Sequence, residues 1–190
     1  MSINFVAIAA LVALLVLGLA VVLWFISTQR ELVNLDEKCS NALSQIEVQM
    51  NSRWDALLSL AKAASAYAKH ESETMIKTIE GRKGVAVHSV EDVNRQQSAF
   101  ADVMGKLMAV HEAYPDLKAS GVYEKAMDAI GKYEDNVRMA RMIYNDTATR
   151  MNRYVRQWPS SFVAGYLHFG VKEYLKIDDG QKRDMPSVFS

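Results

Sequence analysis

Histidines are the side chains best suited to metal binding or proton transfer, and this sequence has four of them. His70 opens the stretch HESE, which lacks the second histidine that a zinc-protease helix carries four residues later. His111 is followed directly by Glu112, and adjacent residues point about 100° apart on a helix. Di-iron bundles place a glutamate three residues before each histidine, and neither these two nor His88 and His168 have one. We therefore predict no metal site, no cofactor and no catalytic residue.

Sulfur and charge exclude further classes of site. Cys39 is the single cysteine, so an intrachain disulfide or a cysteine-based zinc site cannot form. Several of the ten methionines fall at helical spacing, which favours core packing over copper binding. The 22 basic and 22 acidic side chains cancel, so the chain lacks the basic surface typical of nucleic-acid binders.

Two asparagines interrupt a helical pattern near the C-terminal end. Asn145 and Asn152 lie seven residues apart in RMIYNDTATRMNRYVRQWP, residues 141–159, although asparagine disfavours helix interiors. Their side chains either face solvent or form hydrogen bonds between helices that fix the register. Together with Arg141 and Tyr144 they mark a line along which a protein partner could bind.

An uncharged apolar stretch precedes these helices. The segment FVAIAALVALLVLGLAVVLWFI, residues 5–26, would span roughly 33 Å as a helix, enough for a hydrocarbon core of about 30 Å. A cleaved signal peptide is the alternative, but the basic start and small-residue cleavage site are missing. We assign residues 1–27 to a transmembrane anchor. Arg30 and Lys38 follow it, which favours a cytoplasmic location for the rest of the chain.

Apolar residues then recur at helical spacing in three segments. The first runs over residues 28–80 without proline or glycine and ends at Gly81. The second covers about residues 89–113, with Ser89 and Asp92 resembling a capping box. The third covers about residues 122–158 and carries a heptad stripe that ends at Pro159. These lengths predict an all-α fold, in which a single N-terminal transmembrane helix continues into an elongated antiparallel helical bundle with coiled-coil packing.

The first of these helices is longer than the second, so its membrane-proximal half has no evident partner within the chain. That half nevertheless carries an apolar seam, which would be costly to leave in water at about 25 cal/mol per Å². We therefore predict burial against other copies or the C-terminal tail, and we favour a homo-oligomer. The predicted interface consists of Leu32, Leu35, Cys39, Leu43, Ile46 and Met50.

Residues 159–190 follow the bundle as a short helix and a tail. Ser160 or Ser161 is placed to cap this helix, whose dense apolar stretch includes Phe162, Val163 and Tyr166. These side chains either pack back on the bundle or form an interface with a neighbouring subunit or membrane lipid.

The chain resembles the LemA family over nearly its whole length. The block ARMIYNDTATRMNRYVRQWPSSFVAGYLHF, residues 140–169, is similar to the family signature, and HEAYPDLKAS and AYAKHESET match two further stretches. The matching positions are Ala140, Arg141, Tyr144, Asn145, Asn152 and Pro159, with Tyr67, His70 and Glu71 upstream, whereas Ala148, Met151 and Trp158 depart from the usual residues. The resemblance implies a bacterial protein with one transmembrane helix and a helical bundle, and it supplies no catalytic residues.

Two functions are compatible with these features. The first is a membrane-anchored structural or scaffold protein without enzymatic activity that self-associates through its long helices. The second is a membrane-tethered adaptor that binds a separate protease or signalling enzyme along the Tyr144, Asn145 and Asn152 face.

Overall fold

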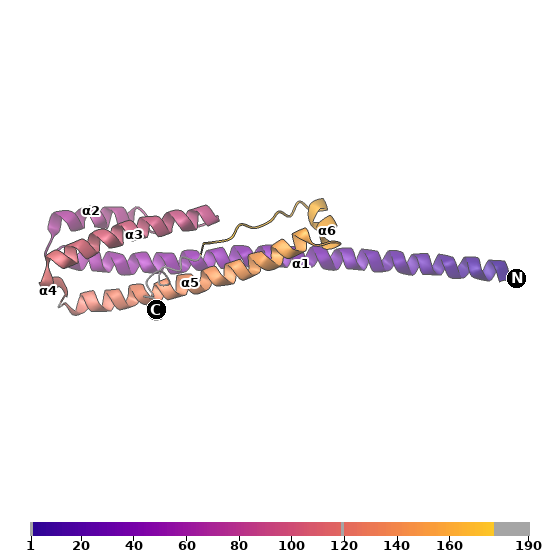
Figure 1. Cartoon of the computed structure of the whole chain (residues 1–190), viewed down its shortest axis with the longest axis horizontal. Coiled ribbons are helices and arrows are strands. Elements are labelled where there is room, and N and C mark those ends of the chain that lie inside the picture. The colour runs from indigo at the N-terminus through magenta and orange to yellow at the C-terminus, as the bar shows by residue number, and fades with distance from the viewer. Residues whose placement is uncertain (1, 119, 177–190) are drawn as a thin grey trace, which may run out of the picture. The chain divides into compact units, whose positions relative to one another are not determined.

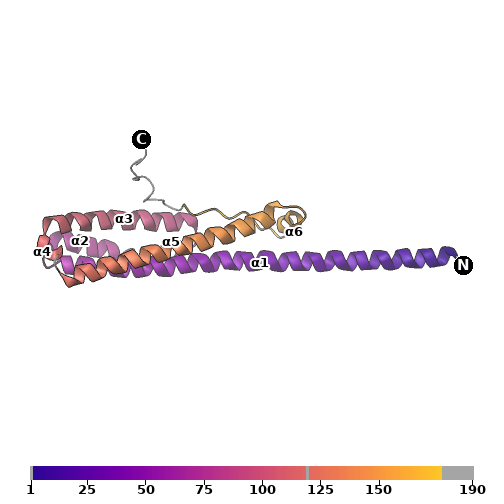
Figure 2. The same cartoon turned by 60° about the horizontal axis from the view of Figure 1, so that its bottom comes forward.

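The computed structural model describes residues 2–118 and 120–176, and all regular structure in that part of the chain is helical (Figures 1 and 2). The predicted all-α fold is confirmed. Within the described residues the helices are α1 (Ser2–Ala64), α2 (Lys69–Glu80), α3 (Val90–Ala113), α4 (Pro115–Lys118), α5 (Gly121–Arg156) and α6 (Ser160–Tyr166). Residues 177–190, the end of the predicted tail, lie outside the described part.

The chain forms two compact units that share helices α1 and α5. The first unit contains residues up to 39 together with 147–172. The second contains residues 40–146 and the end of the chain from residue 173. Each unit is described separately below.

The first unit includes the transmembrane segment at the N-terminal end of α1. From Phe5 the helix is long and apolar enough to cross a bilayer, and the apolar window is not buried by the rest of the chain. Large side chains such as Leu14 and Leu17 are more than 60% exposed, as expected for a surface that lipid covers. The helix continues past Ile26 without interruption, as predicted.

The second unit is a bundle built from the end of α1, helices α2 to α4 and most of α5. Trp54 of α1 packs edge-on against Phe100 of α3, with ring centroids 5.2 Å apart. Around this pair the core contains Leu57, Leu60, Ala61, Ala64, Met75, Ile79, Val103, Leu107, Leu117, Ala126 and Ile130. The burial of Ala126 and Ile130 confirms the predicted heptad stripe in this half of α5.

The prediction of one helix over residues 28–80 is wrong, because α1 ends at Ala64 and α2 begins at Lys69. Neither glycine nor proline marks the break. The Ser65 hydroxyl donates to the Lys62 carbonyl at 2.7 Å, which competes with the helical backbone pattern. Ala61, Ala64 and Ala68 are all buried, so small side chains let the two helices turn closely against the core. Tertiary packing therefore decides this boundary.

The start of α3 follows the prediction. The Ser89 hydroxyl accepts a hydrogen bond from the Asp92 backbone N–H at 3.1 Å, as an N-cap should. The Asp92 carboxylate in turn accepts bonds from the Ser89 hydroxyl at 2.8 Å and the His88 N–H at 3.2 Å. These bonds, the Ser89 hydroxyl first, hold the pKa of the Asp92 carboxyl below its usual value.

The end of α6 reverses the chain. His168 adopts a left-handed backbone with φ of 61°. The Phe169 N–H donates to the Ala164 carbonyl at 2.9 Å and the His168 N–H to the Gly165 carbonyl at 3.3 Å, the pattern of a Schellman motif. From here the chain leads without regular secondary structure to residue 176.

Candidate functional site

Asn152 holds the C-terminal segment within the first unit. Its amide nitrogen donates to the Lys172 carbonyl at 2.9 Å, and its amide oxygen accepts the Lys172 N–H at 2.6 Å. A side-chain amide offers one donor group and one acceptor, so it pairs with a single residue's backbone as a neighbouring peptide would. Asn152 is 4% exposed, and this pairing satisfies a polar group that the helix has buried. Lys172 also forms an ion pair with Asp36 of α1 at 2.5 Å.

Asn145 repeats this arrangement within the second unit. It donates to the Leu175 carbonyl at 2.8 Å and accepts the Leu175 N–H at 2.9 Å. The adjacent Tyr144 hydroxyl donates to the Glu173 carbonyl at 3.1 Å. Leu175 is 3% exposed, so its side chain is buried where its backbone is held. We call Tyr144, Asn145 and Asn152 the tail clamp.

The spacing of the tail clamp matches two different backbone geometries. Seven residues of α-helix rise about 10.5 Å. Three residues of extended chain rise about 10 Å, which is the separation in sequence between Lys172 and Leu175. The asparagine that comes later in α5 pairs with the earlier tail residue.

The two interpretations offered for the asparagines are therefore both wrong. Neither side chain faces solvent alone, and the partner is an extended segment rather than a second helix, because that segment presents free backbone groups and a helix does not. The Arg141 guanidinium donates to Gln97 of α3 at 3.3 Å.

The predicted oligomer seam is covered by the chain itself. Leu32, Leu35, Cys39, Ile46 and Met50 are at most 2% exposed, and Leu43 is half-buried. In the first unit Lys172 reaches Asp36, and in the second the Asn136 amide of α5 donates to Gln49 at 3.1 Å. The premise that this half of α1 lacks an intrachain partner is wrong, and the Lys172–Asp36 ion pair agrees with the other predicted outcome, in which the C-terminal tail contacts the seam.

Cys39 has the properties of a packed apolar residue. Its side chain is buried, and burial raises the pKa of the thiol, with nearby Lys172 acting in the opposite direction to a lesser extent. The thiolate, which is the reactive form, is therefore disfavoured. This agrees with a role in packing within the first unit.

A buried polar network joins three helices of the second unit. Arg53 of α1 has a fully buried side chain that pairs with Glu134 of α5 and donates to Gln97 of α3 at 2.9 Å. Its guanidinium carbon also lies 3.8 Å from the centre of the Phe100 ring. Burial lowers the pKa of Arg53 while Glu134 opposes that shift, and the group stays cationic because arginine starts far above neutral pH.

The sequence reasoning missed this network. The signal in the sequence was Arg53, which stands beside Trp54 in a stretch with continuous apolar periodicity. A lysine or glutamate at such a position would be an ordinary solvent-exposed residue. On α3 the neighbouring Gln96 accepts a hydrogen bond from the Trp54 indole at 3.1 Å. Two adjacent glutamines in a helix of apolar periodicity were the second signal.

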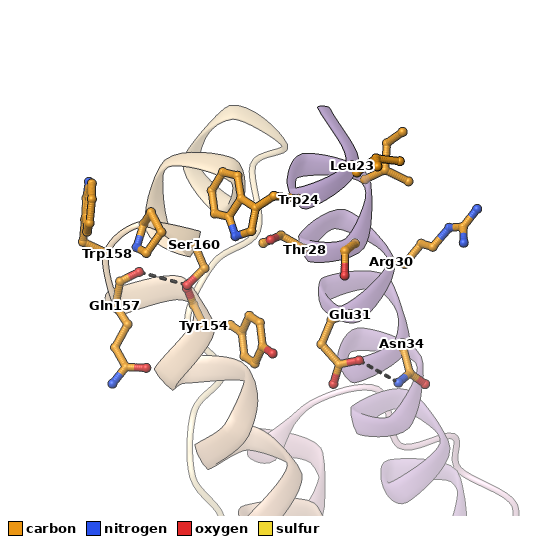
Figure 3. Close-up of a pocket in the computed structure, with 13 residues that line it drawn as sticks. Leu23, Trp24, Thr28, Arg30, Glu31, Asn34, Tyr154, Gln157, Trp158 and Ser160 are labelled. Atoms are coloured by element: carbon orange, nitrogen blue, oxygen red, sulfur yellow. Dashed lines mark hydrogen bonds between the residues drawn. The ribbon is translucent and has the colours of Figure 1, made fainter. Parts of the chain in front are cut away.

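A groove of about 920 Å³ lies in the first unit where α1 leaves the apolar segment (Figure 3). Trp24, Thr28 and Glu31 line it from α1, and Tyr154 and Ser160 line it from the end of α5 and the start of α6. Figure 3 shows Trp24 directed toward the α5–α6 side, whereas Leu23 and Arg30 point away from it. The groove is open and carries both ionic and aromatic groups.

The predicted serine cap of α6 is absent. Ser160 belongs to the helix, and its hydroxyl donates instead to the carbonyls of Tyr154 at 2.8 Å and Gln157 at 2.9 Å (Figure 3 draws the second bond). The Tyr154 carbonyl lies in the last turn of α5, where carbonyls lack an intrahelical partner, and the Gln157 carbonyl also accepts the Ser161 N–H at 2.7 Å. Ser160 thus fastens the end of α5 rather than the start of α6.

The histidines form no metal cluster in the part of the chain that the structure describes. Within the described residues no group of three or more histidine, cysteine, aspartate or glutamate side chains is placed to hold a metal ion. His70 and His88 are exposed, and His111 is buried with its ring stacked 4.3 Å from that of Tyr123. Burial raises the pKa of the Tyr123 phenol. We find no arrangement of these groups that suggests a reaction.

Comparison with known proteins gives the chain its family. The LemA family model matches residues 42–189. Magnetosome protein MamQ 2 of Paramagnetospirillum magneticum (strain AMB-1) is 25% identical over 195 residues, which cover 86% of this chain and 72% of that protein. Protein LemA of Metamycoplasma hominis is 26% identical over 145 residues, covering 75% of this chain and 66% of its own length. The family model covers the tail clamp, all of α5 and the part of α1 from residue 42 onward, and the chain belongs to the LemA family.

Proposed function

We propose that this protein is a non-enzymatic scaffold of the bacterial inner membrane that self-associates through an exposed apolar stripe on α5. The observation that carries the proposal is the exposure of Met139, Met142 and Ile143, which are 58%, 47% and 54% exposed. Their spacing of three and four residues places them on one side of the helix. The buried seam on α1 is not available for this contact.

The stripe borders a hollow suited to a second copy. A groove of about 260 Å³ lies between α1 and α5 in the second unit, lined by Ala42, Gln49, Met139 and Ile143 among others. Methionine adapts its shape to a facing helix. A common membrane anchor confines the copies to one plane, which raises their effective concentration and allows a modest stripe to suffice.

The association can be tested by charging the stripe. We expect Met139→Glu and Ile143→Glu together to reduce the mass of the particle extracted in mild detergent, because two carboxylates would be desolvated at the contact. Val122→Glu is the matched control, since Val122 is also on α5 and is 54% exposed. The measurement is native mass spectrometry. A wild-type particle of a single chain, or a double variant of unchanged mass, would contradict the proposal.

The membrane orientation is part of the proposal. Arg30 and Lys38 follow the transmembrane segment, and positive flanks are retained in the cytoplasm. We expect a fluorescent protein fused after residue 190 to fluoresce in cells and a fused alkaline phosphatase to be inactive. An active phosphatase fusion with a dark fluorescent one would place the bundle on the opposite side.

A further inference from the structure

The end of α5 and helix α6 expose aromatic side chains that the fold leaves uncovered. Trp158 is 86% exposed, Phe162 70% and Tyr166 68%. On the other side of α6, Val163 and Ala164 are fully buried. A helix that is apolar on both sides lies in a protein core or meets lipid, and one side of α6 has no core to enter.

This aromatic surface lies level with the end of the transmembrane segment. The Tyr166 ring contacts that of Phe25 edge-on, with centroids 6.0 Å apart. At the other end of α6, Pro159 and Ser160 line the same groove as Trp24 and Ile26 (Figure 3). Both ends of α6 therefore lie beside the last turn of the apolar stretch. Lipid that surrounds this turn would also reach α6.

The charges of this region fit phospholipid headgroups. Residues 147–172 contain no aspartate or glutamate, and their cations are Arg150, Arg153, Arg156 and Lys172. Arg153 and Arg156 are exposed in the last turn of α5, immediately before Trp158. Tryptophan and tyrosine favour the membrane–water boundary, where an apolar ring and a polar tip are both satisfied. Guanidinium groups bind phosphate at the same depth.

We propose that Trp158, Phe162 and Tyr166 insert into the membrane boundary, so that α6 forms a second membrane contact beside the transmembrane helix. The phospholipid surface is the occupant of this aromatic face, with Arg153 and Arg156 close to the headgroup phosphates. The contact fixes the end of α5 to the bilayer. It does not depend on self-association, since the stripe on α5 belongs to the other unit.

Tryptophan quenching in vesicles tests this directly. The full chain is reconstituted in phosphatidylcholine and phosphatidylglycerol vesicles, with bromine on the acyl chains either near the headgroup or near the bilayer centre. We expect bromine near the headgroups to quench less tryptophan fluorescence in the Trp158→Phe variant than in the wild type. Quenching of the fluorescence by iodide in the water should change little. Trp54→Phe is the matched control, because Trp54 is 1% exposed and should contribute to neither.

Two results would overturn the proposal. If Trp158→Phe lowers the iodide quenching and leaves the bromine quenching intact, the ring is in water. If it changes neither, protein covers the ring, as a neighbouring copy would. A second variant guards against misfolding: Phe162→Asp should reduce the bromine quenching of Trp158, whereas Val122→Asp, on an equally helical and exposed site, should not.

Discussion

A side-chain amide can replace a strand in holding an extended segment. Asn145 and Asn152 each pair with both backbone groups of one tail residue, as neighbouring strands pair in a ladder. Aspartate could supply only part of this pairing, because the ionised carboxylate has no donor. Asparagine is therefore retained inside a helix despite its low helix propensity.

The clamp should be worth a measurable part of the stability. We expect Asn152→Ala to lower the free energy of unfolding by about 1 to 3 kcal/mol, because a buried pair of hydrogen bonds is lost. Asn136→Ala is the matched control on the same helix, since its bond to Gln49 is exposed, and it should cost less than about 0.5 kcal/mol. Chemical denaturation in detergent gives both values, and equal losses would show that the clamp adds nothing.

Arg53 of α1 contacts both α3 and α5, through Gln97 and Glu134. Its side chain is fully buried while that of its partner Glu134 is 49% exposed, so losing the arginine would leave the carboxylate free to hydrate. Replacement by an apolar chain of similar length removes the cost of burying a cation. Replacement by lysine keeps the charge but removes the flat stacking on Phe100 and most of the donors.

We therefore expect Arg53→Lys to destabilise the bundle more than Arg53→Met does. The lysine variant should lose about 3 to 5 kcal/mol, the cost typical of breaking a buried charge network. Thermal unfolding followed by circular dichroism ranks the two variants against the wild type. A lysine variant as stable as the wild type would show that the guanidinium geometry is unimportant.

Several elements were predictable because their signals are local. The apolar stretch, the Ser89 cap and the heptad stripe around Ala126 and Ile130 depend on side chains near in sequence, and they appear as predicted. The stripe does not continue to Pro159, because α5 ends at Arg156 and Trp158 is 86% exposed. The break after Ala64 and the role of Asn145 depend on what packs against them. The apolar seam of α1 leaves burial against the tail as one of two possible outcomes, but the tail carries no periodicity of its own that would show where it binds.

The chain buries the apolar seam of α1 that follows the transmembrane segment without help from other copies. The seam of Leu32 to Met50 lies partly in each unit, and α5 and the tail contribute to both. If self-association uses the exposed stripe on α5, it joins chains whose hydrophobic cores are already complete. Assembly and folding would be separate steps in such a protein.

Hydrogen exchange at high dilution shows whether the chain folds before it self-associates or only when it self-associates. We expect the amides of residues 32–50 to exchange slowly even where single chains dominate, because their side chains are buried within the chain. The solvent-exposed stretch around Val85 and Ala86 should exchange fast and serves as the internal reference. Fast exchange of residues 32–50 upon dilution would mean that other copies are needed to complete the fold.

In the tail clamp, seven residues of helix and three residues of extended chain rise by nearly the same distance. This match limits which insertions and deletions such a chain can accept. Inserting one residue between Asn145 and Asn152 would rotate one amide by about 100° around the helix and displace it by about 1.5 Å. A deletion between Lys172 and Leu175 would shorten the opposing segment by about 3.3 Å. Substitutions between Asn145 and Asn152, or between Lys172 and Leu175, leave both pairings possible. The two pairings require that the separations of seven and three residues be kept together.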